Sequence, residues 1–170
     1  MELSTREFWA LVHGLLLGGA FLVAFAGGLA GLYSLRPELV TEVGVTERVR
    51  RLIWGTTGMA VVAWATVITG TWIVYPWYRE DVPESPRSEL LANTDTEDWH
   101  EFAFEWKEHV AWISPMLATA VAFIVLYYRQ DLIRNQFVRR LAMGLFVAAF
   151  LTAAIAGILG ALVTKKAPIT

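Results

Sequence analysis

The sequence contains no cysteine. This absence excludes disulfide bonds, catalysis by a thiolate, and iron–sulfur or zinc sites that are held by cysteine. Charge of one sign is not in large excess either, because the formal net charge is only −2. A chain with so little net charge and no basic patch interleaved with aromatic residues is not expected to bind nucleic acid. The chemistry of any functional site must therefore come from other side chains.

Four long segments contain no lysine, arginine, aspartate or glutamate. They cover residues 8–33, 52–78, 110–128 and 141–163. A helix needs about 20 apolar residues to cross a bilayer core about 30 Å thick, and all four segments meet that requirement. Because 56% of the residues are hydrophobic, most of the chain also cannot form the surface of a soluble domain. The sequence therefore predicts an all-α fold, an integral membrane four-helix bundle that forms one domain over residues 1–170.

The segment between the second and third spans, residues 79–109, is predicted to lie outside the membrane. Pro83 and Pro86 oppose a regular helix at its start. Residues 94–97 read Thr-Asp-Thr-Glu, the pattern of a capping box, which predicts that the third helix begins near Asp95 and extends beyond the membrane. Aromatic and acidic side chains fall on opposite faces of this extension, so it is predicted to be amphipathic.

The loops on the two sides of the four spans differ in charge. Residues 34–51 and 129–140 hold eight arginines, whereas the N-terminus, residues 79–109 and the C-terminus hold six arginines and lysines together. The positive-inside rule then places residues 34–51 and 129–140 in the cytoplasm. The termini and residues 79–109 are expected outside the cell (inner) membrane. Twelve of the sixteen acidic residues lie on that side and would form an acidic external face.

Histidine is rare, and two of the three histidines lie where a membrane cofactor would need them. His13 lies about one and a half turns into the first span, and His109 lies at the membrane entrance of the third span, at the same end. A b-type haem held by two histidines requires one imidazole on each of two facing helices at similar depth. The placement therefore predicts one haem b with His13 and His109 as its metal ligands. His100 points away from His109 around the same helix and is not assigned to this site.

Neighbouring residues would complete the predicted haem site. The additional cofactor-binding residues are Gly14, Gly18, Gly70, Arg79, Lys107 and Glu105. The glycines leave room for a flat macrocycle. Either of the two cations can pair with the haem propionates. Glu105 lies one helical turn before His109, where its carboxylate can accept the Nδ1 hydrogen bond of that imidazole and so determine which ring nitrogen faces a metal.

The same residues leave other functions open. Glu105 and His109 are four residues apart on one helix face, so a copper or other metal site around them is an alternative to haem. Small residues recur four apart in the first and fourth spans. That pattern packs helices closely and also fits a cofactor-free structural or assembly subunit of a larger membrane complex. No serine–histidine–aspartate set, phosphate-binding glycine loop or inward-facing carboxylate pair occurs, so no catalytic residue is assigned.

With four spans, a small size, His13 and His109 at one end and glycines beside them, the chain resembles the four-helix membrane b-type cytochrome subunits that anchor respiratory oxidoreductases. The resemblance implies electron transfer to or from quinones as a subunit of a respiratory-chain complex rather than as a separate enzyme. A quinone is then a second expected cofactor, near Trp72 or Tyr75. The expected partners are lipid, other membrane subunits and, at the acidic external face, a soluble cytochrome or another electron carrier.

Overall fold

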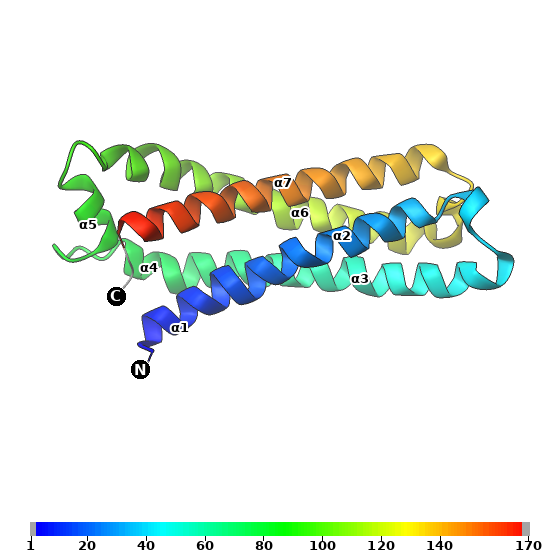
Figure 1. Cartoon of the computed structure of the whole chain (residues 1–170), viewed down its shortest axis with the longest axis horizontal. Coiled ribbons are helices and arrows are strands. Elements are labelled where there is room, and N and C mark those ends of the chain that lie inside the picture. The colour runs from blue at the N-terminus through cyan, green and yellow to red at the C-terminus, as the bar shows by residue number, and fades with distance from the viewer. Residues whose placement is uncertain (1–2, 168–170) are drawn as a thin grey trace.

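The structure, a computed structural model, describes residues 3–167, and for residues 42 and 43 only the course of the backbone. Every regular element within residues 3–167 is helical. Four long helices are apolar enough to cross a membrane: Thr5–Ser34, Gly44–Tyr78, Trp99–Leu132 and Gln136–Lys166. The prediction of an all-α fold with four such segments is therefore confirmed. Figure 1 shows the four long helices lying side by side, with both ends of the chain near the same end of the molecule.

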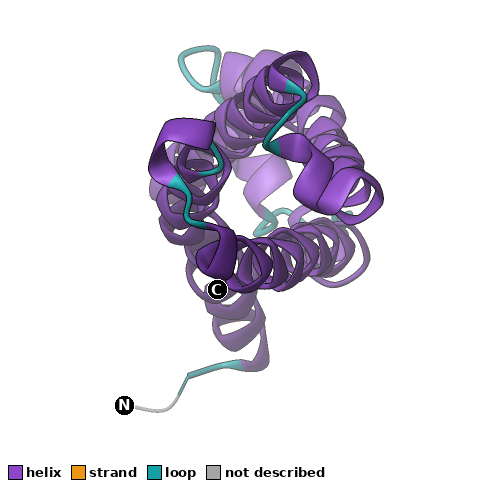
Figure 2. Ribbon diagram, turned by 90° about the vertical axis from the view of Figure 1, so that its right-hand side faces the viewer, coloured by secondary structure: helices purple, strands orange, loops and turns teal. Residues whose placement is uncertain are grey.

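Each long helix except the fourth is divided into shorter elements. The first contains α1 (Thr5–Leu11), η1 (Val12–Gly18) and α2 (Gly19–Ser34), and the second contains α3 (Glu42–Thr69), η3 (Gly70–Val74) and α4 (Tyr75–Tyr78). The third contains η4 (Trp99–Phe104), α6 (Glu105–Tyr128) and η5 (Arg129–Leu132), and the fourth is α7 (Gln136–Lys166). The connections carry η2 (Pro37–Leu39) and α5 (Pro86–Leu91). Seen end-on, the helices surround a common axis, while the N-terminal end stands away from the others (Figure 2).

Three of these elements, η1, η3 and η4, are π-helical, which means that their turns are wider than those of an α-helix. Pro76 accounts for η3. A proline inside an α-helix clashes with the carbonyl group four residues earlier, which here belongs to Trp72. Trp72 lies within η3, so the wider turn relieves the clash and the helix continues through Pro76 into α4.

The connection between the second and third long helices differs from the prediction. Pro86 does not prevent a helix but begins one, α5, because a proline in the first turn gives up no helical hydrogen bond. The Oγ of Ser85 caps this helix by accepting a hydrogen bond of 3.2 Å from the backbone N–H of Ser88. Proline opposes a helix only beyond its first turn, and the prediction did not allow for this position.

The capping box predicted at residues 94–97 is not formed. Residues 94–96 form turns, and the helix begins at Glu97 rather than near Asp95. The hydroxyl of Thr96 donates a hydrogen bond of 2.8 Å to the carbonyl oxygen of Leu90 in α5. This side chain ties the connection back to α5.

Two hydrophobic clusters form the interior. The larger one joins all four long helices in the half of the molecule farther from α5 and includes Leu32, Leu52, Val125 and Phe146. The smaller one lies beside α5 and is formed by Tyr78, Leu90, Phe104, Val163 and Ala167. The space between the two clusters holds the candidate site.

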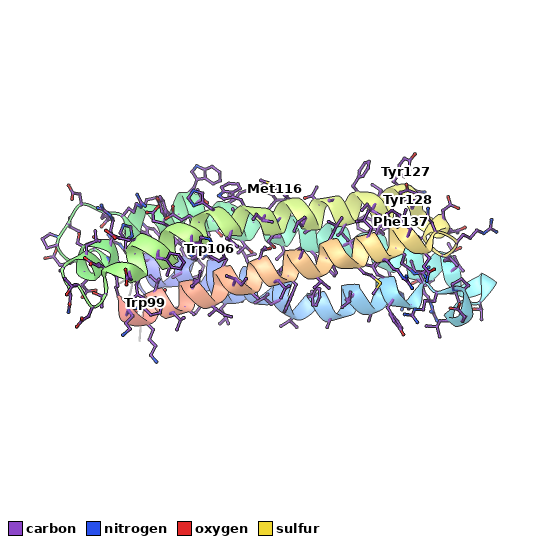
Figure 3. The ribbon with its side chains drawn as sticks, turned by 90° about the horizontal axis from the view of Figure 1, so that it is seen from above. Trp99, Trp106, Met116, Tyr127, Tyr128 and Phe137 are labelled. Atoms are coloured by element: carbon purple, nitrogen blue, oxygen red, sulfur yellow. The ribbon has the colours of Figure 1, made fainter. Side chains whose placement is uncertain are left out.

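The outward faces of the long helices are apolar as well. Figure 3 shows Met116, Tyr127 and Phe137 projecting from the molecule. Their side chains are 55%, 71% and 75% exposed, respectively. Outward-facing apolar side chains on long helices are compatible with contact to lipid.

Candidate functional site

A cavity of about 800 Å³ lies between the four long helices, near the end that carries α5. Ligand pockets in proteins are typically of this size and largely apolar, with a few polar groups that orient the ligand. All three π-helical elements contribute to its wall, through His13 of η1, Gly70 of η3 and Phe104 of η4. Widened helical turns often occur at functional sites, so the cavity is the strongest candidate for one.

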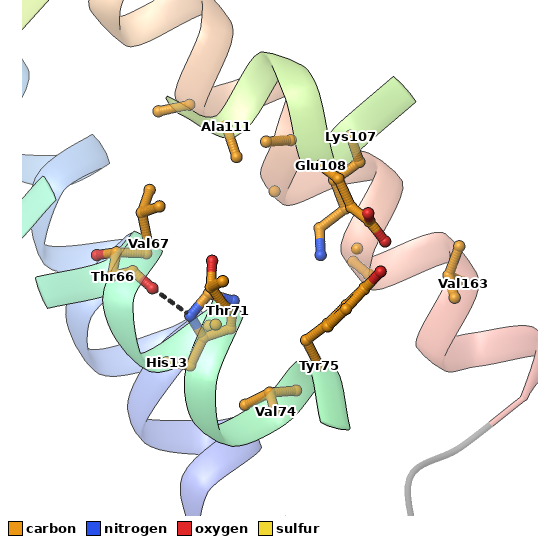
Figure 4. Close-up of a pocket in the computed structure, with 18 of the residues that line it drawn as sticks. His13, Thr66, Val67, Thr71, Val74, Tyr75, Lys107, Glu108, Ala111 and Val163 are labelled. Carbon is orange, nitrogen blue, oxygen red and sulfur yellow. Dashed lines mark hydrogen bonds between the residues drawn. The ribbon is translucent and has the colours of Figure 1, made fainter. Parts of the chain in front are cut away.

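His13 is the histidine of this cavity. Its Nδ1 lies 2.8 Å from the carbonyl oxygen of Thr66 in α3, and Figure 4 shows this hydrogen bond at the edge of the cavity. A carbonyl oxygen only accepts hydrogen bonds, so Nδ1 carries the proton, and in a neutral ring Nε2 keeps its lone pair. One turn farther along the same helix, a Cβ added to Gly70 would lie 2.5 Å from Cε1 and 3.1 Å from Nδ1 of this ring. The ring therefore rests against the second long helix, hydrogen-bonded to Thr66 and in close contact with Gly70.

Lys107 and Glu108 bring charge to the opposite wall, which is formed by α6. Figure 4 shows the Lys107 side chain reaching from α6 into the cavity. Its Nζ lies 4.7 Å from the centre of the Phe104 ring, and its Cε packs against Gly160 of α7, where an added Cβ would be 3.1 Å away. Oε1 of Glu108 is buried and has no hydrogen-bond partner in the part of the chain that the structure describes. The nearest cationic nitrogen, Nη2 of Arg79, is 3.9 Å away, which is too far for a hydrogen bond.

A polar network lies between the cavity and α5. The hydroxyl of Tyr78 lies 2.9 Å from Nδ1 of His100, which is buried. Nε of Arg87 in α5 lies 3.4 Å from Nε2 of the same imidazole. Arg79 pairs with the carboxylate of Glu105, whose Oε1 is 3.9 Å from Nε2 of His100. These contacts fasten α4, α5, η4 and α6 to one another at the end of the cavity.

The structure brings most of the predicted cofactor-binding residues to this cavity. Five of the eight line it, and these are His13, Gly14, Gly18, Gly70 and Lys107. Arg79 and Glu105 pair with each other beyond the lining. His109 is exposed and does not belong to the lining. The structure therefore brings only one of the two predicted haem ligands to the cavity.

The predicted hydrogen bond between the side chains of Glu105 and His109 is not present. Nδ1 of His109 instead donates to the backbone carbonyl oxygen of Glu105, at 2.8 Å, because that carbonyl lies directly beneath it on the same helix. The carboxylate of Glu105 is directed to Arg79. Within residues 3–167, no group of three or more histidine, aspartate or glutamate side chains is arranged to hold a metal ion.

Two contributors to the site were missed by reasoning from the sequence. Thr66 acts through its backbone carbonyl, which no residue pattern reveals. Glu108 is one of the acidic side chains that the amphipathic pattern of the extension sets opposite the aromatic ones, but it lines the cavity. One signal was available in the sequence. Lys107 and Glu108 are adjacent charged residues directly before the apolar span 110–128, a position from which their side chains can form the polar end of a cavity.

Comparisons with other proteins add no further assignment. No protein family model, no curated protein and no solved structure matches this chain. The functional argument therefore depends on the geometry of the cavity and on the chemistry of its side chains.

Proposed function

We propose that this chain is an integral membrane four-helix bundle that serves as the electron-transfer subunit of a respiratory or quinone-linked oxidoreductase complex, with one b-type haem in the cavity. The carrying observation is the setting of His13. Its Nδ1 donates to the carbonyl oxygen of Thr66 over 2.8 Å, and its Nε2 is left as a metal ligand beside a cavity of about 800 Å³. A backbone acceptor on the second ring nitrogen is the usual support of a metal-binding histidine.

The lining of the cavity fits a haem in three respects. The walls are mainly apolar, as a porphyrin requires, and the glycines at positions 14, 18 and 70 lie where the lining must be thin. Lys107 is a cation suited to a propionate. A bound haem would supply a one-electron redox couple, while His13 would hold the iron and the apolar walls would exclude water.

The second axial ligand defines how the haem is held. His109 remains the predicted partner of His13, and its use requires α6 to turn that exposed side chain inward. Without this movement, His13 is the one histidine among the described lining residues, and it would hold a haem without a second histidine. The two arrangements differ in spin state, so a spectrum separates them.

The test is an absorption spectrum of the purified chain, as isolated and after titration with haemin. We expect a Soret band that is lost in His13→Ala. His100→Ala is the matched control, because His100 does not itself line the cavity and is hydrogen-bonded to Tyr78 at the cavity's end. Loss of the band in His109→Ala as well supports the pairing of His13 with His109. A wild-type protein that is folded by circular dichroism and takes up no haemin contradicts the proposal.

A quinone site is a second candidate function, favoured by the polar group at one end of an otherwise apolar cavity. Lys107, Glu108 and Tyr75 line this end, and Tyr75 is one of the residues named for quinone binding from the sequence. A cation and a hydroxyl can donate hydrogen bonds to the carbonyl oxygens of a quinone head. Two results would favour this candidate over haem. A solvent extract of the purified, haem-free protein should contain quinone, and the extract of Lys107→Met should contain less of it.

We also propose that the end carrying α5 and both termini faces the outside of the cell membrane and docks a basic electron carrier. The acidic residues concentrated in residues 79–109 support this proposal, because complementary charge steers association. Binding of a basic soluble cytochrome to the protein in vesicles should weaken steeply with added salt. Binding that is independent of salt argues against such docking.

A further inference from the structure

The cavity has an open side, and two elements frame it. Among the described lining residues, the exposed ones belong only to η1 and α7: Gly14 and Leu15 on η1, and Gly157, Ala161, Thr164 and Lys165 on α7. The lining residues of α3 and α6 are all buried or half-buried. The cavity therefore opens sideways, between the first and fourth long helices.

Small residues frame this opening. A Cβ added to Gly14 or to Gly157 would meet no atom within 4 Å, so neither glycine is needed for close helix packing here. Farther along the same helices the packing is tight, because a Cβ on Gly28 of α2 would lie 2.6 Å from the ring of Phe146 in α7. Figures 1 and 2 show the N-terminal end of the first long helix diverging from the other helices. We name the gap between η1 and α7, at Gly14, Leu15, Gly157 and Ala161, the lateral window.

The interior of the cavity indicates what passes through the window. Lys107 reaches into the cavity, and no hydrogen bond or ion pair involves its Nζ in the described part of the chain. Oε1 of Glu108, on the same wall, is buried and has no hydrogen-bond partner within residues 3–167; its nearest cation, Arg79, is 3.9 Å away. Unpaired polar groups of this kind are costly in an apolar environment unless a ligand satisfies them. The occupant therefore has a polar end, which meets Lys107, and an apolar body, which faces the window.

We propose that the cavity is loaded from the bilayer through the lateral window, by an amphiphilic molecule that enters with its polar end toward Lys107. This inference deepens the proposed function and rests on it for the identity of the occupant. A b-type haem is such a molecule, with an apolar macrocycle and two propionates on one edge. Because its attachment is not covalent, a haem must enter the folded chain by some route. Lys165, eight residues beyond Gly157 on α7, is exposed and also lines the cavity.

The test compares Gly157→Trp with Gly144→Trp. Both glycines lie on α7, are exposed, and have no atom within 4 Å of an added Cβ, but only Gly157 lines the cavity. Protein in vesicles receives haemin that is dissolved in a second population of vesicles, and the growth of the Soret band is followed. We expect Gly157→Trp to slow loading by about tenfold or more, as closing an access route does, and Gly144→Trp to load like wild type. Equal loading by both variants overturns the inference.

A second readout does not depend on haem. The chain has no cysteine, so Ala111→Cys places a single thiol on the cavity wall. A lipid-dissolved pyrene maleimide should label this thiol, and a charged water-soluble maleimide should label it much more slowly. Adding Gly157→Trp should suppress the lipid-borne labelling, whereas adding Gly144→Trp should not. Labelling that is fastest from water places the entrance elsewhere and overturns the inference. Window-dependent labelling in a protein that takes up no haemin retains the lateral route and rejects only the haem.

Discussion

The imidazole of His13 lies directly against Gly70, and a methyl group at that glycine would stand 2.5 Å from Cε1 and 3.2 Å from Nε2 of the ring. Contacts this short do not occur between real atoms, so either the ring or the helix must move. Nδ1 of the same ring donates a hydrogen bond to the carbonyl oxygen of Thr66, one turn earlier on that helix. The two contacts together place a candidate metal ligand with little freedom.

Gly70→Ala should therefore displace His13 and break its hydrogen bond to Thr66. If His13 holds a haem, we expect haemin affinity to fall by about tenfold or more, since the loss of support for a metal ligand typically has this effect. Gly19→Ala is the matched control, because a Cβ there meets no atom within 4 Å and Gly19 does not line the cavity. Haemin titration measures both affinities. An affinity unchanged in Gly70→Ala would show that the position of this ring does not matter for binding.

Gly28→Ala should destabilise the protein. The added Cβ would lie 2.6 Å from Cε1 and 2.8 Å from Cζ of Phe146, which is 1% exposed and cannot move aside freely. Overpacking of this kind costs about 1–3 kcal/mol. The neighbouring Gly27→Ala meets no atom and should be neutral or slightly stabilising, since alanine favours a helix by about 1 kcal/mol over glycine. Thermal unfolding of the two variants in one detergent tests this contrast, and similar midpoints would refute it.

Arg139→Ala should weaken the end of the molecule opposite α5. This side chain is 5% exposed, and its Nη1 donates to the carbonyl oxygens of Leu35, Leu132 and Ile133 at 3.1, 2.9 and 3.0 Å. Without the guanidinium, these buried carbonyl oxygens have lost a hydrogen-bond donor. We therefore expect the free energy of unfolding to fall by about 3 kcal/mol.

Arg140→Ala is the control for Arg139→Ala. It removes the same charge from the adjacent position, where the side chain is exposed. A change of about 0.5 kcal/mol or less is expected there. Chemical denaturation of the two variants gives both values, and equal losses would attribute the effect to charge rather than to the three hydrogen bonds.

Arg129→Gly should stabilise the turn between α6 and α7. Arg129 has a φ of 44°, the only positive φ of a non-glycine residue within the described chain. Its backbone is strained by about 1 kcal/mol relative to glycine, which adopts this region without a penalty from Cβ. Arg134→Gly, in the same connection but without a positive φ, should give no such gain. A higher unfolding midpoint in Arg134→Gly than in Arg129→Gly would contradict this account.

The number and the approximate limits of the long helices could be predicted because they follow from the absence of charge over about 20 residues, a property that the sequence displays directly. The position of His13 at the candidate site followed from its depth along the first span. His109 shows where this reasoning stops. Depth along a helix follows from counting residues, but the face on which a side chain lies depends on the rotation of the helix against its neighbours.

Rotation was difficult to predict here because the helices are not uniform. A π-helical element changes the number of residues per turn, so the direction in which a counted face points does not follow from the count alone. The aromatic face of the third long helix points outward, since Phe102, Trp106 and Ile113 on it are 69%, 46% and 43% exposed. The cavity depends on where the helices diverge, and the sequence of a single helix does not predict this.

The widened turn η1 determines how the first long helix responds to the insertion or deletion of a residue. It acts as an inserted residue in the first long helix. The faces that residues 5–11 and residues 19–34 turn toward the rest of the protein are therefore not related by the regular α-helical count. Deleting one residue within η1 would replace the wide turn that carries His13 by a regular helical turn, with little change in the direction of residues 5–11. Length polymorphism at this point would therefore alter the chemistry of the cavity, while single-residue insertions in the connection that carries α5 would leave it intact.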